Sequence, residues 1–246
     1  MFKKSLAAVA VLAAFAGSAY AADVTMYGRV DLGLRFTNTD ADKANVDDVN
    51  KFEMVSGNYT GSRFGVKGEE DLGNGMKVGF VLENGFSADD GNFGTADKLF
   101  DRQASLHLKG SFGEVAFGRM GILNSTAGTF GIGQLSAFET GWGDVGNQNL
   151  IWGAGFGSRY DNMVTYQSPK FAGMQATAQY SFKQNSVSGS GNEGTSKVDR
   201  YAGLAVTGEY GPLQMVGAYE LTKYANTKDA HDETHAFYLG GNYDLQ

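Results

Sequence analysis

The sequence predicts an antiparallel, membrane-spanning β-barrel, and three observations support that fold class. First, apolar and polar residues alternate. In the expected strand from residue 24 to 36, one face is apolar and the other is polar. The apolar face has Val24, Met26, Val30, Leu32, Leu34 and Phe36, and the polar face has Thr25, Arg29, Asp31 and Arg35. Second, this pattern recurs along the chain in runs of about ten residues, the length of a tilted strand that crosses a bilayer. Third, there are 36 glycines and 13% aromatics but two prolines, which suits many strands joined by tight turns. Only a closed barrel pairs every backbone group inside lipid without helices.

Ten strands are expected, and turn signals divide them in order. The first is 24–36. The last is 235–245. Between them lie four pairs of strands, and each pair is joined by a short connection: 60–70 and 76–86 by DLGNG, 101–110 and 114–119 by SFG, 159–168 and 174–183 by PKFAG, and 200–210 and 213–225 by Gly211-Pro212.

The other connections are long and polar: 37–59, 87–100, 120–158, 184–199 and 226–234. One rim of the barrel therefore carries turns and the other loops, as in outer-membrane barrels. A soluble β-sandwich would also give many short strands, but it has no reason to sort its connections by length on alternate hairpins.

The first 21 residues are typical of a secretory signal peptide, with Lys3 and Lys4 before an apolar run and Ala19-Tyr20-Ala21 at the cleavage site. Residues 22–246 then form one barrel domain. Loss of the two lysines takes the formal net charge from −7 to −9, which argues against nucleic acid as a partner. The sequence has no cysteine, so disulfides and thiolate metal sites are excluded.

Four segments resemble the general diffusion porins, most closely the trimeric 16-stranded porins of β-proteobacteria. They are YGRVDLGLRF (27–36), SRFGVKGEEDLGNGMKVGFVLENGF (62–86), RQASLHLKGSFGEVAFGR (102–119) and SRYDNMVTYQSPKFAGM (158–174), and they occur in the family's order. The resemblance implies a homotrimer in the outer-membrane lipid. It also implies a passive aqueous channel for small hydrophilic solutes and ions, with no cofactor and no chemistry.

The resemblance further implies a constriction of the channel. A third loop, here the connection from Met120 to Ser158, would fold into the lumen. Its acids Glu139 and Asp144 would face a basic wall of Arg29, Arg63, Arg102 and Arg159. Fixed charges at a constriction orient polar solutes and bias ion flow.

Alternation independently places Arg29 and Arg63 on the inner face, but Arg102 shares parity with Ala104, Leu106 and Leu108. Arg102 therefore needs a bulge or a position beyond the lipid band. The loop lacks the enterobacterial Pro-Glu-Phe-Gly signature, so which acid faces the arginines stays open, as does the ion preference. Because the family has about six more strands and a terminal aromatic, the chain is expected to be a truncated barrel with two unpaired edges.

Three weaker signals suggest other functions. Residues 189–194, GSGNEG, match a dinucleotide fingerprint but precede a strand where a phosphate site needs a helix. His231 and His235 have a metal-ligand spacing but lie where a loop runs into a strand. Ser105 and His107 share a strand face, which raises the alternative of an outer-membrane lipid hydrolase, although the sequence indicates no third, orienting group.

Overall fold

The computed structural model describes residues 23–39, 49–123, 125, 129–130, 159–185, 191–225 and 233–245. The expected signal peptide and most of the connection from Met120 to Ser158 lie outside these residues. Within the described part no helix is long and apolar enough to cross a membrane.

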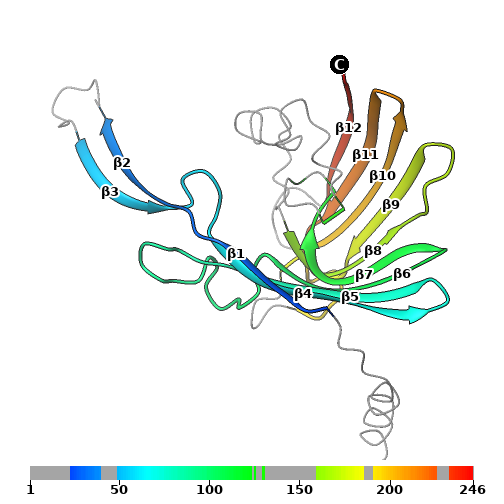
Figure 1. Cartoon of the computed structure of the whole chain (residues 1–246), viewed down its shortest axis with the longest axis horizontal. Helices are drawn as coiled ribbons and strands as arrows, with labels where there is room; N and C mark the ends of the chain where they lie inside the picture. Colours follow the sequence, from blue (N-terminus) through cyan, green and yellow to red (C-terminus); the bar gives the residue numbers. More distant parts are fainter. Residues whose placement is uncertain are drawn as a thin grey trace, which may run out of the picture.

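The described strands form one ten-stranded antiparallel sheet and a separate two-stranded hairpin. The sheet runs β1-β4-β5-β6-β7-β8-β9-β10-β11-β12 and curls from β1 round to β12 (Figure 1). Its strands are β1 Thr25–Arg29, β4 Arg63–Gly73, β5 Met76–Gly85, β6 Gln103–Gly110, β7 Gly113–Gly121, β8 Arg159–Gln167, β9 Met174–Ser181, β10 Arg200–Tyr210, β11 Leu213–Lys223 and β12 Glu233–Tyr243. Each of the ten predicted strands has a counterpart in this sheet, which is open in the described residues, with β1 and β12 at its edges.

The first predicted strand is wrong in its length. Residues 24–36 do not form one strand: β1 ends at Arg29, and β2, Leu32–Thr39, leaves the sheet to pair with β3, Val49–Ser56. The predicted loop 37–59 therefore contains a strand, and the hairpin β2–β3 projects away from the sheet (Figure 1).

Asp31 supplies the physical reason for this break. Its carboxylate accepts hydrogen bonds from the backbone N–H groups of Tyr59 and Thr60, at 3.0 and 2.7 Å. Its own N–H donates to the hydroxyl of Ser62 at 2.9 Å. The backbone at Asp31 is thus bonded to the β3–β4 corner, and the chain bends there.

The two faces of the sheet have the polarity that the alternation predicts. Large apolar side chains on the outer face are exposed: Leu106, Phe117, Tyr166, Leu204, Val206, Phe237 and Leu239. Polar side chains on the inner face are buried: Ser105, His107, Thr165, Thr177, Gln179, Glu220 and Thr222. A soluble protein has the opposite arrangement, whereas a barrel in lipid with a polar lumen requires this one.

The apolar core lies on the inner face and includes the start of the chain that follows β7. Ile122 packs with Met120, Tyr160, Met163 and Tyr201, and Leu123 packs with Ala205 and Val216. Phe130 packs against both clusters. We call residues 121–123 and 129–130 the loop root. The described part of the long connection thus begins inside the curl of the sheet.

Candidate functional site: the charged lumen wall

A cluster of arginines lies on the inner face at the rim where the long connections emerge. Arg29, the last residue of β1, lies directly opposite Arg63, the first residue of β4. Like charges directly opposite each other in a sheet destabilise it. Arg63 offsets part of this cost through hydrogen bonds from its guanidinium to the Thr60 hydroxyl, at 2.7 Å, and to the Gly61 carbonyl, at 3.0 Å.

Glu83 connects this pair to Arg102. One carboxylate oxygen of Glu83 accepts from Nε of Arg102 at 2.6 Å, and the other accepts from the hydroxyl of Tyr27 at 3.0 Å. Both side chains of the ion pair are largely buried, with 17% of Arg102 and 16% of Glu83 exposed. Alternation along the strand would place Arg102 on the apolar face with Ala104 and Leu106. The residue instead precedes β6 and lies outside the strand's hydrogen-bonded ladder, so this alternation does not apply to it. Its side chain is therefore free to turn inward.

Arg159 on β8 is the fourth arginine of the cluster. It is the first residue of β8 and lies opposite Gly121. Its guanidinium lies within electrostatic range of Arg102, Arg119 and the carboxylates of Glu83 and Asp101, and Arg63 lies within range of Arg102, Glu83 and Arg29. The structure therefore brings all four predicted arginines into one connected group of charges.

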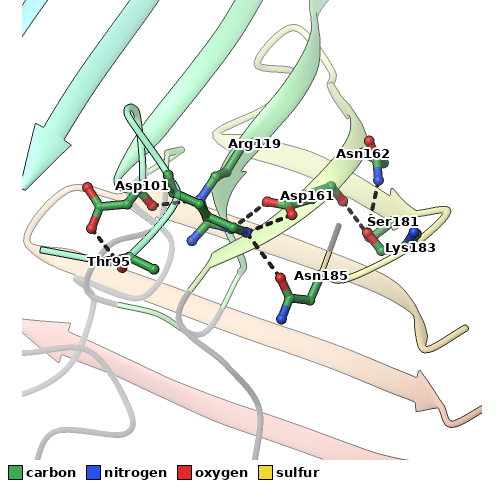
Figure 2. Close-up of polar contacts among 9 residues, drawn as sticks. Thr95, Asp101, Arg119, Asp161, Asn162, Ser181, Lys183 and Asn185 are labelled. Atoms are coloured by element: carbon green, nitrogen blue, oxygen red, sulfur yellow. Dashed lines mark hydrogen bonds and ion pairs between the residues drawn. The ribbon is translucent and has the colours of Figure 1, made fainter. Parts of the chain in front are cut away.

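A second ionic network lies beside this group, and no motif in the sequence indicates it (Figure 2). Asp161 on β8 pairs with Arg119 on β7 at 2.5 Å and with Lys98 from the β5–β6 connection at 2.8 Å. Arg119 also donates to the backbone carbonyl of Asp101, whose carboxylate accepts from Thr95 at 3.0 Å. Lys98 also donates to the side-chain oxygen of Asn185 at 3.1 Å, so the network joins residues up to 87 positions apart, which no local spacing reveals.

The two predicted loop acids, Glu139 and Asp144, lie outside the described residues. Within the described part, Arg102 and Arg119 have carboxylate partners, whereas Arg29, Arg63 and Arg159 form no ion pair. The wall as described therefore carries an excess of positive charge toward the lumen.

Ser105 and His107 do have a third, orienting group, which comes from the neighbouring strand and has no signal in the local sequence. Nδ1 of His107 lies 2.6 Å from Oε1 of Glu114 on β7, and Nε2 lies 2.8 Å from the Ser105 hydroxyl. The distances are those of a catalytic triad. However, Ser105 is 5% exposed on the inner face, away from any lipid substrate, and its neighbours Val81 and Gly118 pair with it in the ladder. No backbone N–H at Ser105 is thus placed to stabilise an oxyanion.

The remaining signals stay separate from the wall. His231 lies outside the described residues, and His235 on β12 contacts the hydroxyl of Tyr219 at 2.7 Å on the outer face. No metal-binding group of side chains occurs among the described residues. Of GSGNEG, residues 191–194 are described, and they lie in a turn region without a helix.

A curled antiparallel sheet with an apolar outer face, a polar inner face and a charged rim defines an outer-membrane-type β-barrel. The comparisons with known proteins agree: the model of the Gram-negative porin family matches residues 8–246. The chain belongs to that family, and its localisation is the outer membrane.

Two of the relatives carry the name of outer membrane porins. An outer membrane porin protein of Bordetella pertussis is 35% identical over 99% of this chain and 66% of its own length. Outer membrane porin protein 32 of Delftia acidovorans is 36% identical over 86% of this chain and 57% of its own. The chain spans between half and two thirds of the length of the curated relatives it matches.

Solved structures give the same fold. An anion-selective porin from Comamonas acidovorans has a TM-score of 0.64 at 27% identity, and the match covers 91% of this chain and 64% of that one. A Salmonella typhi OmpF structure has a TM-score of 0.58 at 18% identity, which supports the fold alone.

Proposed function

We propose that this chain forms the greater part of a water-filled channel through which small hydrophilic solutes and ions diffuse passively, without a cofactor. The observation that supports this most is the inverted polarity of the sheet. The exposed outer face carries residues such as Leu204 and Leu239, while the buried inner face carries Thr177, Gln179 and Glu220. A polar inner face beneath a lipid-facing band is the arrangement of a barrel with an aqueous lumen.

The constriction is the second part of the proposal. The arginine cluster would form its basic wall, and Glu139 and Asp144, on the connection that starts inward at Ile122 and Leu123, would form its acidic side. Among the described residues the guanidinium groups of Arg29, Arg63 and Arg159 have no carboxylate partner, and their positive charge favours anions in the lumen. A relative named as an anion-selective porin supports the same preference.

The test is the reversal potential across a salt gradient, measured on the full-length protein in a planar bilayer. Replacement of Arg29 and Arg63 by Ala should shift permeability toward cations, because two positive charges leave the field at the constriction. Glu139→Gln with Asp144→Asn should shift it toward anions. Lys170→Gln with Glu209→Gln is the matched control, since that exposed pair lies at the opposite, turn-bearing rim.

The outcomes separate three cases. Opposite shifts in the two variant pairs support the constriction. A channel whose selectivity neither pair changes would place the constriction elsewhere. A protein that inserts but never conducts would overturn the channel itself.

The functional unit proposed is a homotrimer, as the family resemblance implies. Conductance should then rise in groups of three equal steps. A catalytic role is not proposed, because the Ser105 side chain is only 5% exposed and lies on the inner face, away from lipid.

A further inference from the structure

We propose that the outer face of β10 and β11 carries a binding site for the phosphate group of an outer-leaflet lipid, formed by Arg200 and Lys223. The site does not depend on whether the barrel conducts, because the outer face of any membrane barrel meets lipid. It concerns neither the arginines of the lumen wall nor the loop acids.

The register of the sheet places both cations on the outer face. Arg200, the first residue of β10, lies directly opposite Lys223, the last residue of β11. The ladder between these strands runs without a register shift, so the pair shares a face with Leu204 and its partner Tyr219. Leu204 is one of the exposed apolar residues of that face. Arg200 and Lys223 therefore lie on the side of the sheet that faces away from the lumen.

The height of this pair matches the outer boundary of the lipid hydrocarbon. At the turn-bearing rim the same two strands end with Tyr210 opposite Leu213, on the outer face, and Leu204 and Val206 lie between the two ends. From Tyr210 to Arg200 the strand advances ten residues. At about 3.4 Å per residue and a tilt of about 40°, ten residues rise about 25 Å, which is the height of the apolar band of an outer-membrane barrel. The pair therefore lies where the headgroups begin, at the loop-bearing rim, and such loops face the outside of the cell.

The pair carries positive charge that its neighbours do not balance. Like charges directly opposite each other destabilise a sheet. Within the described part of the chain Arg200 forms no ion pair, and its Nε is buried without a hydrogen-bond partner. Lys223 has one acidic neighbour, Glu233 of β12, with 3.6 Å between Nζ and Oε2, and 48% of the lysine and 40% of the glutamate side chain are exposed. Such an exposed contact contributes little. An anion that bridges the two cations would offset their repulsion.

The chemistry of the pair and of its surroundings favours a lipid phosphate. A guanidinium offers parallel N–H donors and an ammonium a compact charge, and both groups bind phosphate in proteins. Toward the turn-bearing rim, Tyr219 stacks on His235 with 6.0 Å between ring centroids and packs against Phe237 at 4.8 Å. Aromatic side chains at this height are typical of the interface between a barrel and the headgroups. An apolar face that ends in two cations is complementary to acyl chains that end in a phosphate.

The experiment measures lipid retention by the full-length protein in detergent, with native mass spectrometry. The probe is dioleoyl phosphatidic acid, and phosphatidylcholine with the same acyl chains is the headgroup control, because its choline balances the phosphate charge. The parent protein should retain phosphatidic acid in preference to phosphatidylcholine. Arg200→Gln with Lys223→Gln should weaken the retention of phosphatidic acid about tenfold or more, because hydrogen bonds between charged groups are lost.

Glu233→Gln should act in the opposite direction. It removes the carboxylate that lies beside Lys223, so the lysine would meet the phosphate without a competing anion. The retention of phosphatidic acid should therefore rise. A purely structural role of these side chains predicts no such gain.

Lys77→Gln with Lys109→Gln is the matched control. These two lysines also lie directly opposite each other, on β5 and β6, but they share the inner face with His107. The control removes the same charge from the same type of pair. Its retention of phosphatidic acid should match that of the parent protein.

Each result decides the proposal. Parent-like retention in the variant of Arg200 and Lys223, or an equal loss in the inner-face control, would overturn the site. Inorganic phosphate that displaces the lipid at concentrations as low as those of phosphatidic acid would overturn the lipid as the ligand. Should the double variant fail to fold, Lys223→Gln decides alone, since that side chain is half-exposed. None of these results depends on conduction, which the reversal potentials test separately.

Discussion

At the scale of single residues, the absence of a side chain at Gly65 allows the lumen wall to form. Gly65 on β4 lies between Tyr27 on β1 and Glu83 on β5 in the register. A Cβ at this position would lie 2.6 Å from Cζ of the tyrosine. The ring therefore crosses β4 over the glycine, and its hydroxyl reaches the carboxylate that also holds Arg102. One glycine thus links three strands into a single electrostatic unit.

The same scale gives a test of which face meets lipid. Leu204 lies near the middle of β10 on the outer face and is 53% exposed. Leu204→Arg should destabilise a completed barrel by about 2–4 kcal/mol if the residue lies near the bilayer midplane. Thr207→Arg, on the inner face of the same strand, should cost much less. Urea unfolding in lipid vesicles measures both, and equal losses would contradict the assignment of faces.

At the scale of elements, ionic contacts fasten the connections to the rim. The β5–β6 connection reaches across to β8 through Lys98, and Arg119 on β7 approaches the same carboxylate of Asp161 (Figure 2). The hydroxyl of Ser181 on β9 donates to the backbone carbonyl of Asp161 at 2.6 Å. Four elements therefore meet at one residue of β8.

This convergence predicts the effect of Asp161→Asn. Only 10% of the aspartate side chain is exposed, so its removal leaves two partly buried cations without their shared partner. The expected loss of stability is about 3 kcal/mol. Limited proteolysis should then cut the β5–β6 connection faster. Glu209→Gln is the control, because its pair with Lys170 is more than half exposed and such pairs contribute little. Similar losses of stability in both variants would show that burial does not determine how much an ion pair contributes to stability.

At the scale of the whole molecule, the sheet separates two environments. Its outer face carries exposed apolar residues, and its inner face combines buried polar side chains with an excess of arginine at the rim. The net charge of the chain is negative, yet the described wall is positive. Ion preference follows the local field at the narrowest point rather than total charge.

The local origin of the field predicts a salt dependence. In about 1 M salt the Debye length is about 3 Å, so fixed charges at the wall are screened from most passing ions. The permeability ratio should therefore approach the ratio of ion mobilities as the mean salt concentration rises at a constant gradient. Reversal potentials at low and high salt measure this. The permeability ratio of the double variant Arg29→Ala, Arg63→Ala should differ less between low and high salt. A permeability ratio of the parent protein that does not depend on salt would point to selection by size.

Alternation and turn signals were enough to predict the fold class, the ten strands of the sheet and the alternation of apolar and polar faces along them, because these signals are local and strands have a period of two. The bend at Asp31, the inward turn of Arg102, the partner of His107 and the packing of Leu123 on Ala205 and Val216 are seen in the folded structure alone. Each of these depends on side chains that the register brings together from distant strands, and register is a property of the assembled sheet. The loop acids Glu139 and Asp144 remain predictions from the sequence.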